Sequence, residues 1–204
     1  MTLSRRLTAL LPIASAIWLA ASVLIAGALR PGYSHSAQFM SELGATGTSG
    51  AWAMNGFGFI PAELLLLAFL CLAAAAMRRR GLALAGLSVL AVYALGLIIG
   101  ALAPCDTDCR PVDPSATHRI HMLAGAVAYL SGLTGIALLA VAVGRLGARR
   151  LMIAGIACGA VGLALFLSLA PEHPQVGLIQ RGLESVIYGC LIAFGLWLSR
   201  FSEP

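Results

Sequence analysis

Six long apolar runs most constrain how this chain folds. A helix needs about 20 apolar residues to cross the hydrocarbon core of a bilayer. The chain is 60% hydrophobic and only 10% charged, whereas a soluble domain carries about 25% charged residues. We therefore predict an all-α integral membrane protein, a single domain over residues 1–204 formed by a six-transmembrane-helix bundle. The predicted spans are residues 8–29, 54–77, 82–103, 118–143, 150–170 and 180–199.

The distribution of arginines distinguishes the two sides of the predicted bundle. Positive residues mark the cytoplasmic side of a membrane protein, and most arginines fall on one side. We therefore expect cytoplasmic termini, three longer outward-facing loops, and an active face on the outside of the bacterial cytoplasmic (inner) membrane. All histidines and all acidic residues except Glu203 belong to the outward side. The cytoplasmic arginines are Arg5, Arg6, Arg78, Arg79, Arg80, Arg145, Arg149, Arg150 and Arg200.

The ends of the predicted helices carry two further signals. The first apolar run follows Arg5 and Arg6, and the apolar core of a signal peptide likewise follows positively charged residues. It exceeds the ~7–15 residues of a signal-peptide core, so we expect a retained membrane helix. The first helix of each pair ends alike, in GALRP, GALAP and LSLAP. Three related hairpins would give this pattern, and so would ordinary proline termination of helices.

The polar segment 104–121, PCDTDCRPVDPSATHRIH, separates two apolar runs and has the densest reactive chemistry in the chain. Cys105 and Cys109 lie four positions apart in it. A disulfide would staple this loop in an oxidising compartment. A metal-binding pair and a redox couple are alternatives. The redox interpretation is weakened because three residues, rather than the familiar two, separate the cysteines.

His118 and His121 lie three positions apart, which places them on one face of a helix. Asp113 and Pro114 suit the start of that helix. Two histidines supply half of a site for a divalent metal such as Zn²⁺, and His173 is the first candidate to complete it. Interfacial histidines bonded to loop carbonyls and water are the alternative. Further candidate ligands are Asp106, Asp108, Glu42 and Glu63.

Two sets of polar residues lie within the apolar runs themselves. Arg181, Glu184 and Tyr188 form a polar stripe at helical spacing. Ionisable residues at membrane depth are costly unless they are paired or face a cavity. Arg181 and Glu184 therefore suggest either an ion pair or a site at which arginine binds an anionic group. Glu63, with Asn55 on a similar face, suggests a proton-transfer group or a protonated carboxyl bonded to a neighbouring helix.

The first outer loop contains PGYSHSAQFMSELGA, and the next contains Cys-Asp-x-x-Cys at 105–109 with His118 after it. Together with the six-helix layout, these motifs resemble the membrane family catalogued as domain of unknown function 998. The resemblance implies a prokaryotic membrane protein with no established activity. It also implies that one site contains Ser41, Glu42, Cys105, Asp106, Cys109 and His118.

These residues predict an outward-facing polar pocket, and our leading hypothesis is an enzyme that acts on a lipid or small amphiphile. The reaction would be metal-assisted hydrolysis: the histidines hold metal or transfer protons, an acidic loop residue activates water, and Arg181 binds an anionic group. A non-catalytic lipid- or partner-binding subunit and a proton-coupled transporter using Glu63 are the alternatives. No cluster suited to nucleic acid is present. The candidate catalytic residues are His118, His121, Glu42, Asp106 and Glu63, and the candidate substrate-binding residues are Arg181, Glu184, Ser41, Tyr188 and Asn55.

Overall fold

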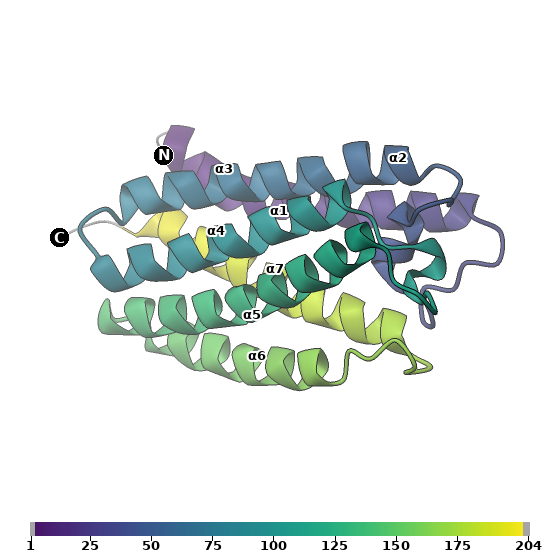
Figure 1. The fold of residues 1–204 in the computed structure, drawn as a ribbon. Coiled ribbons are helices and arrows are strands. Elements are labelled where there is room, and N and C mark those ends of the chain that lie inside the picture. Colours follow the sequence, from purple (N-terminus) through teal and green to yellow (C-terminus); the bar gives the residue numbers. More distant parts are fainter. Residues whose placement is uncertain (1–2, 202–204) are drawn as a thin grey trace.

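The computed structural model describes residues 3–201, and within them it contains six membrane-length helical spans and no β-strand. This confirms the all-α, six-span fold class (Figure 1). Glu203, predicted on the cytoplasmic side, lies outside the described residues. The helices are α1 (Leu3–Leu29), α2 (Ala51–Ala53), α3 (Ile60–Ala76), α4 (Gly81–Leu102), α5 (Ala116–Arg145), α6 (Arg149–Leu167) and α7 (Val176–Arg200), with short turns η1 (Met40–Gly44), η2 (Met54–Phe59) and η3 (Thr107–Cys109).

The second span is continuous from α2 through η2 into α3. It begins at Ala51, three residues before the predicted start, and η2 is a π-helical segment. Such segments frequently occur at functional sites. Within η2, Asn55 donates from Nδ2 to the carbonyl oxygen of Gly44 at 2.9 Å, which ties this span to η1.

The start of α5 differs from the predicted capping by Asp113. The N-cap is Ser115, whose Oγ accepts from the backbone N–H of His118 at 3.1 Å. Asp106 orients this cap by accepting from the N–H of Ser115 at 2.8 Å and from its hydroxyl at 2.6 Å. These bonds to Ser115 lower the pKa of the Asp106 carboxyl. Asp106 is therefore a support for the start of α5.

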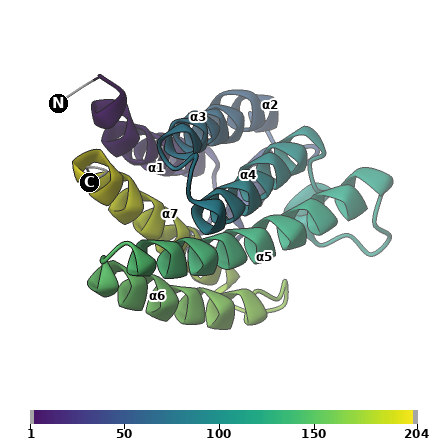
Figure 2. The same ribbon diagram turned by 90° about the vertical axis from the view of Figure 1, so that its left-hand side faces the viewer.

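The helices pack through small residues. Gly96 on α4 faces Ala128 and the carbonyl of Ala124 on α5, and Gly86 similarly faces Gly135, so side chains at these glycines would overlap with the neighbouring helix. Small residues allow such close approach in membranes. Figure 2 shows α7 between α1 and α6, with α6 at the edge of the bundle against α5.

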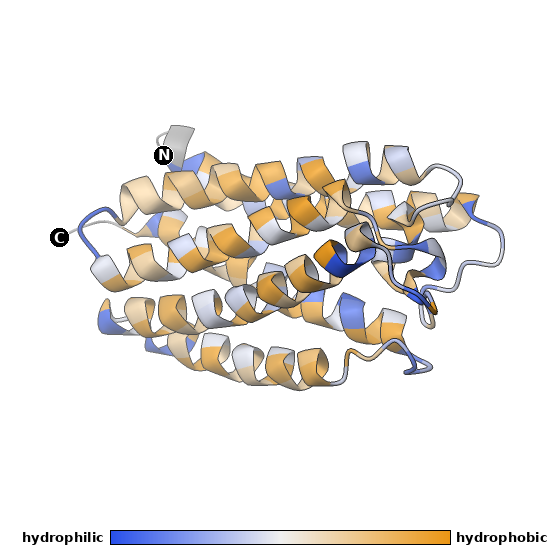
Figure 3. Ribbon diagram, viewed as in Figure 1, coloured by the Kyte–Doolittle hydropathy of each residue, from blue (hydrophilic) through white to orange (hydrophobic). Residues whose placement is uncertain are grey.

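Polar residues gather at both ends of the bundle, while the helices between them are mainly apolar (Figure 3). The two arginine-rich loops, at 77–80 and 146–148 with their flanking arginines, lie at the same end as the first and last described residues (Figure 1). At the opposite end, residues 30–50, 103–115 and 168–175 form a layer that we call the roof. The charge rule predicts that the roof faces outward.

Gly177, at the start of α7, supports one edge of the roof. A Cβ atom there would collide with the carbonyl oxygens of His35, Ser36 and Gln38. We expect Gly177→Ala to lower the free energy of unfolding by about 1–3 kcal/mol through overpacking. Gly189→Ala is the control on the same helix, since no atom beyond its own stretch of helix lies within 4 Å of the added methyl group. Melting of both variants in detergent tests this, and equal melting temperatures would contradict it.

Candidate functional site

Glu42 supports the roof through its carboxylate. Oε1 accepts from the N–H of Phe39 at 3.0 Å, and Oε2 accepts from the amide of Gln38 at 2.7 Å. A guanidinium nitrogen of Arg110 lies 3.7 Å from Oε1. The Glu42 side chain is buried, and both of its oxygens are engaged within the loops. Glu42 therefore connects segments of the roof, and it is not among the residues that line the cavity described below.

Arg181 connects α7 to the first roof loop. Its guanidinium donates to the carbonyl of Gln38 at 3.1 Å, to the Tyr33 hydroxyl at 2.7 Å and to Nδ1 of His35 at 3.0 Å. Burial lowers the pKa of His35, and the positive charge of Arg181 lowers it further. Because arginine only donates, Nδ1 of His35 carries the lone pair. Arg181 thus has partners other than Glu184, and the suggested ion pair between them is not formed.

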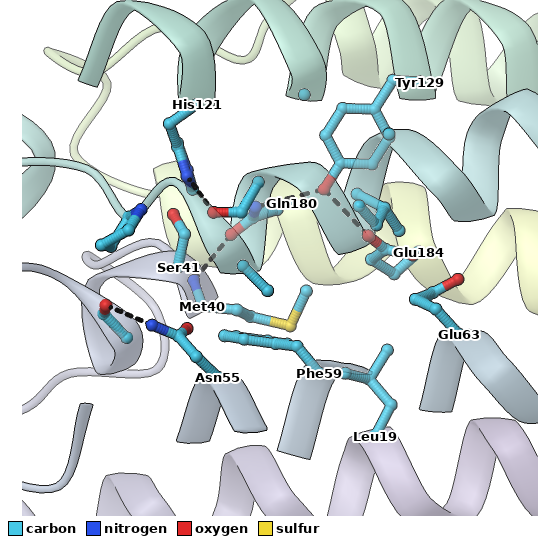
Figure 4. Close-up of a pocket in the computed structure, with 17 residues that line it drawn as sticks. Leu19, Met40, Ser41, Asn55, Phe59, Glu63, His121, Tyr129, Gln180 and Glu184 are labelled. Atoms are coloured by element: carbon cyan, nitrogen blue, oxygen red, sulfur yellow. Dashed lines mark hydrogen bonds between the residues drawn. The ribbon is translucent and has the colours of Figure 1, made fainter. Parts of the chain in front are cut away.

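A cavity of about 80 Å³ lies beneath the roof, inside the bundle. A single water needs roughly 10–15 Å³ by this measure, so the cavity has space for several waters or a small polar group. It is lined from α1, η1, η2, α3, α4, α5 and α7 (Figure 4). The structure therefore brings together several residues that the sequence analysis selected separately, namely Ser41, Asn55, Glu63, His121 and Glu184.

Glu184 is the centre of a hydrogen-bond network at this cavity. Its carboxylate accepts from the hydroxyl of Tyr93 at 2.5 Å and from that of Tyr129 at 2.9 Å. Gln180 donates to the Tyr129 hydroxyl at 3.1 Å and accepts from the backbone N–H of Met40 at 2.6 Å. The network connects α4, α5 and α7 to the roof. Both oxygens of Glu184 are therefore held in place.

Glu63 lines the same end of the cavity as Glu184 (Figure 4). Its Oε1 accepts from the hydroxyl of Tyr188 at 3.0 Å. Its Oε2 is buried and has no hydrogen-bond partner among the described residues. Such a group costs about 1–3 kcal/mol unless a water or ligand satisfies it. Tyr188 therefore orients Glu63, and the free oxygen marks a position for a bound polar atom.

The outer histidines have separate environments. His121 lines the cavity, and its Nδ1 lies 2.9 Å from the carbonyl oxygen of Gly100 and 3.2 Å from that of Ala103. His118 and His173 instead line an open surface hollow of about 540 Å³. Within the described chain, the three histidines do not bring their ligand atoms together around one point. The geometry therefore offers no site for a metal held by all three.

Cys105 and Cys109 form a disulfide, as the sequence suggested. Both are buried, together with Phe39 and Val176. Ser41 contacts the bridge, because its hydroxyl lies 3.6 Å from the Cys109 sulfur. The disulfide therefore closes a short turn within the second roof loop, and Ser41 of the first roof loop lies against it.

A groove of about 200 Å³ adjoins the cavity between α5, α7 and the end of α6. The two spaces are adjacent, because five residues line both of them: Ser41, His121, Gly125, Tyr129 and Gln180. Apart from Cys109, the remaining lining of the groove is apolar and consists of Phe39, Met122, Ala126, Phe166 and Leu169. A cavity that contains two carboxyl groups thus adjoins an apolar groove at the edge of the bundle.

The sequence profile of a family described as "Protein of unknown function (DUF998)" matches residues 13–197. The chain belongs to this family. The match includes most of the first and last spans and all of the other four, and it covers the cavity, the groove and the roof. No curated protein and no solved structure matches the chain. Membership in DUF998 confirms the resemblance seen in the sequence, and it brings no reaction or ligand with it.

Tyr93 is a site residue that the sequence analysis missed. It lies within the apolar α4 and is fully buried. The available signal was its hydroxyl, because a buried tyrosine usually finds a hydrogen-bond partner. Its partner, Glu184, lies far along the chain. Sequence spacing alone therefore could not pair them.

Arg181 provides a test of how the roof is held. We expect Arg181→Ala to lower the free energy of unfolding by about 2–3 kcal/mol, because charge-assisted bonds to the first loop are lost. Arg119→Ala is the matched control, since Arg119 is exposed near the roof end of α5. Thermal melting and proteolysis of the first loop report the difference. An Arg181→Ala protein as stable and protease-resistant as the control would contradict the assignment.

Proposed function

We propose that this DUF998 protein is a membrane-embedded enzyme that acts on a lipid or small amphiphile. The polar head would occupy the cavity beside Glu63 and Glu184, and the apolar tail would lie in the adjoining groove. The observation that carries this proposal is that a cavity lined by two carboxyl groups adjoins an apolar groove and shares five lining residues with it.

The shape of the two spaces favours an amphiphile over a fully water-soluble ligand. Residues of η1 cover the cavity on the roof side, and Met40 there is bonded to Gln180. The groove lies beside α6, which is the least buried membrane span. The free energy of an apolar chain changes little when it moves from lipid into this groove, since both environments are apolar. The polar head gains the hydrogen-bonding groups of the cavity.

The proposed chemistry is general acid–base catalysis. Tyr93 and Tyr129 hold both oxygens of Glu184, which suits it to anchoring a donor group on the ligand. Glu63 is oriented by Tyr188 and retains one free oxygen for proton exchange with the ligand. Positioned carboxyls contribute typically 10²- to 10⁴-fold as acids or bases. This proposal does not include metal-assisted hydrolysis by three histidines, because His118 and His173 do not line the cavity.

A proton-coupled transporter using Glu63 receives less support. Such a protein needs a polar route from the cavity to the arginine-loop side. On α3 the buried residues that follow Glu63 are entirely apolar: Leu66, Phe69, Leu70 and Ala73. A cavity that ends at Glu63 suits binding or chemistry on one side of the membrane. A non-catalytic binding protein would use the same site without turnover.

Gly125 is the position at which the cavity and groove can be separated by mutation. It lines both spaces, and no atom beyond its own stretch of helix lies within 4 Å of an added Cβ. We expect Gly125→Leu to fold and to lose amphiphile binding at least tenfold, because the new side chain would fill the space between the cavity and the groove that a bound amphiphile would cross. Gly159→Leu on α6 is the control, with equally open space at its Cβ.

Native mass spectrometry after incubation with total bacterial lipid extract measures this binding. The proposal predicts a retained adduct in wild type and in Gly159→Leu, and its loss in Gly125→Leu. Equal retention by both variants would show that the ligand does not pass Gly125.

Glu63→Gln separates catalysis from binding. The amide keeps the shape and the bond to Tyr188 but cannot exchange a proton as a carboxyl does. We expect the amphiphile adduct to persist while turnover of lipid extract in nanodiscs falls by about 10²-fold or more. Glu172→Gln, on an exposed loop, should retain full turnover. Unchanged turnover in Glu63→Gln would remove Glu63 from the chemistry, and wild-type protein that binds without any turnover would identify a binding protein.

A further inference from the structure

Three potential metal ligands converge where the roof meets the cavity. The sulfurs of Cys105 and Cys109 and a ring nitrogen of His121 all lie within 4.8 Å of one another. The cysteines come from the second roof loop, and His121 comes from the first turns of α5. In the oxidised protein the two sulfurs are bonded to each other, so neither is a thiolate ligand.

We propose that reduction of the Cys105–Cys109 disulfide creates a Zn²⁺ site formed by these two cysteines and His121. Thiolate and imidazole are the ligands that Zn²⁺ prefers, and three protein ligands with an open fourth position are typical of reactive zinc sites. The inference goes beyond the proposed function and does not depend on it, because it concerns the roof and requires no amphiphile.

The spacing of the three groups suits a tetrahedral ion. With zinc–sulfur bonds of about 2.3 Å, two ligating sulfurs are about 3.8 Å apart. The three ligand atoms already lie within 4.8 Å, so reduction needs only local separation of the sulfurs. No residue from a distant part of the fold has to move into the site.

The environment of His121 also suits a ligand. Its Nδ1 faces the carbonyl oxygens of Gly100 and Ala103 and therefore donates its hydrogen to them. In the neutral ring this leaves the lone pair on Nε2. A ligating histidine generally donates its other ring N–H to a carbonyl or carboxylate in this way, which fixes the ring orientation.

The open coordination position would face the cavity. His121 and Ser41 both line the cavity, and the Ser41 hydroxyl lies 3.6 Å from the Cys109 sulfur. That hydroxyl can donate a hydrogen bond to the thiolate of Cys109. A water molecule has space in the cavity to complete the coordination sphere.

The redox and proton balance is defined. A dithiol supplies two electrons and two protons to the Cys105–Cys109 bond and becomes a disulfide itself. The two protein thiols then release their protons as they bind Zn²⁺. The disulfide and the zinc site are mutually exclusive, so the metal content of the protein reports the redox state of this loop.

The test compares oxidised protein with protein reduced by a phosphine, which does not compete as a thiol ligand for zinc. Detergent-purified chain without added amphiphile is incubated with Zn²⁺, desalted and analysed for metal. We expect about one zinc per chain after reduction and at least tenfold less in the oxidised sample. His121→Ala and Cys109→Ser should lower zinc affinity at least tenfold, while His118→Ala and His173→Ala should retain it.

Cobalt substitution provides a second readout that needs no variant. Reduced wild-type protein with Co²⁺ should show thiolate charge-transfer absorption and tetrahedral d–d bands, and oxidised protein should show neither. No metal in the reduced wild type, or full zinc affinity in a folded His121→Ala protein, would overturn the proposal. Amphiphile binding is measured in a separate experiment. A protein that binds no zinc can therefore still bind amphiphile, and a protein that binds no amphiphile can still bind zinc.

Discussion

The hydrogen-bonded carboxylate of Glu184 is the interaction on which the arrangement of the bundle depends most. In a bilayer core no water is available to satisfy polar groups, so each one needs a protein partner or a cavity. Tyr93 and Tyr129 supply those partners from two other helices. Gln180 extends the network to the backbone of Met40 in the roof. One acidic residue thus fixes how three helices and the covering loops are placed relative to one another.

The polar residues on this side of the molecule have two different roles. Arg181 and Glu42 hold the roof loops, and all their contacts described here are to those loops or to the start of α7. Glu63 differs because one carboxyl oxygen remains without a partner among the described residues. A scaffold of satisfied groups around one unsatisfied group is the arrangement expected of a binding site, since the ligand then completes the hydrogen bonding.

The sequence predicted the six membrane-length helices because bilayer thickness imposes a length and a hydropathy that can be read without knowing any contact. Contacts between loops were less predictable. Arg181 and Glu184 are three positions apart, but a helix start lying under a folded loop gives the arginine closer partners in Tyr33 and His35. Likewise Asp113 suited a helix cap, although Asp106 and Ser115 form it. These outcomes depend on how the roof folds back over the bundle, which local spacing does not encode.

The most direct test of the central claim is a high-resolution structure of the protein in lipid nanodiscs. Our account predicts elongated density that runs from the groove beside Phe166, past Gly125, and ends in a polar feature within hydrogen-bonding distance of Glu63. Density of this form would establish that an amphiphile occupies both spaces at once. A groove closed by side chains, with only water in the cavity next to Glu63 and Glu184, would contradict the account.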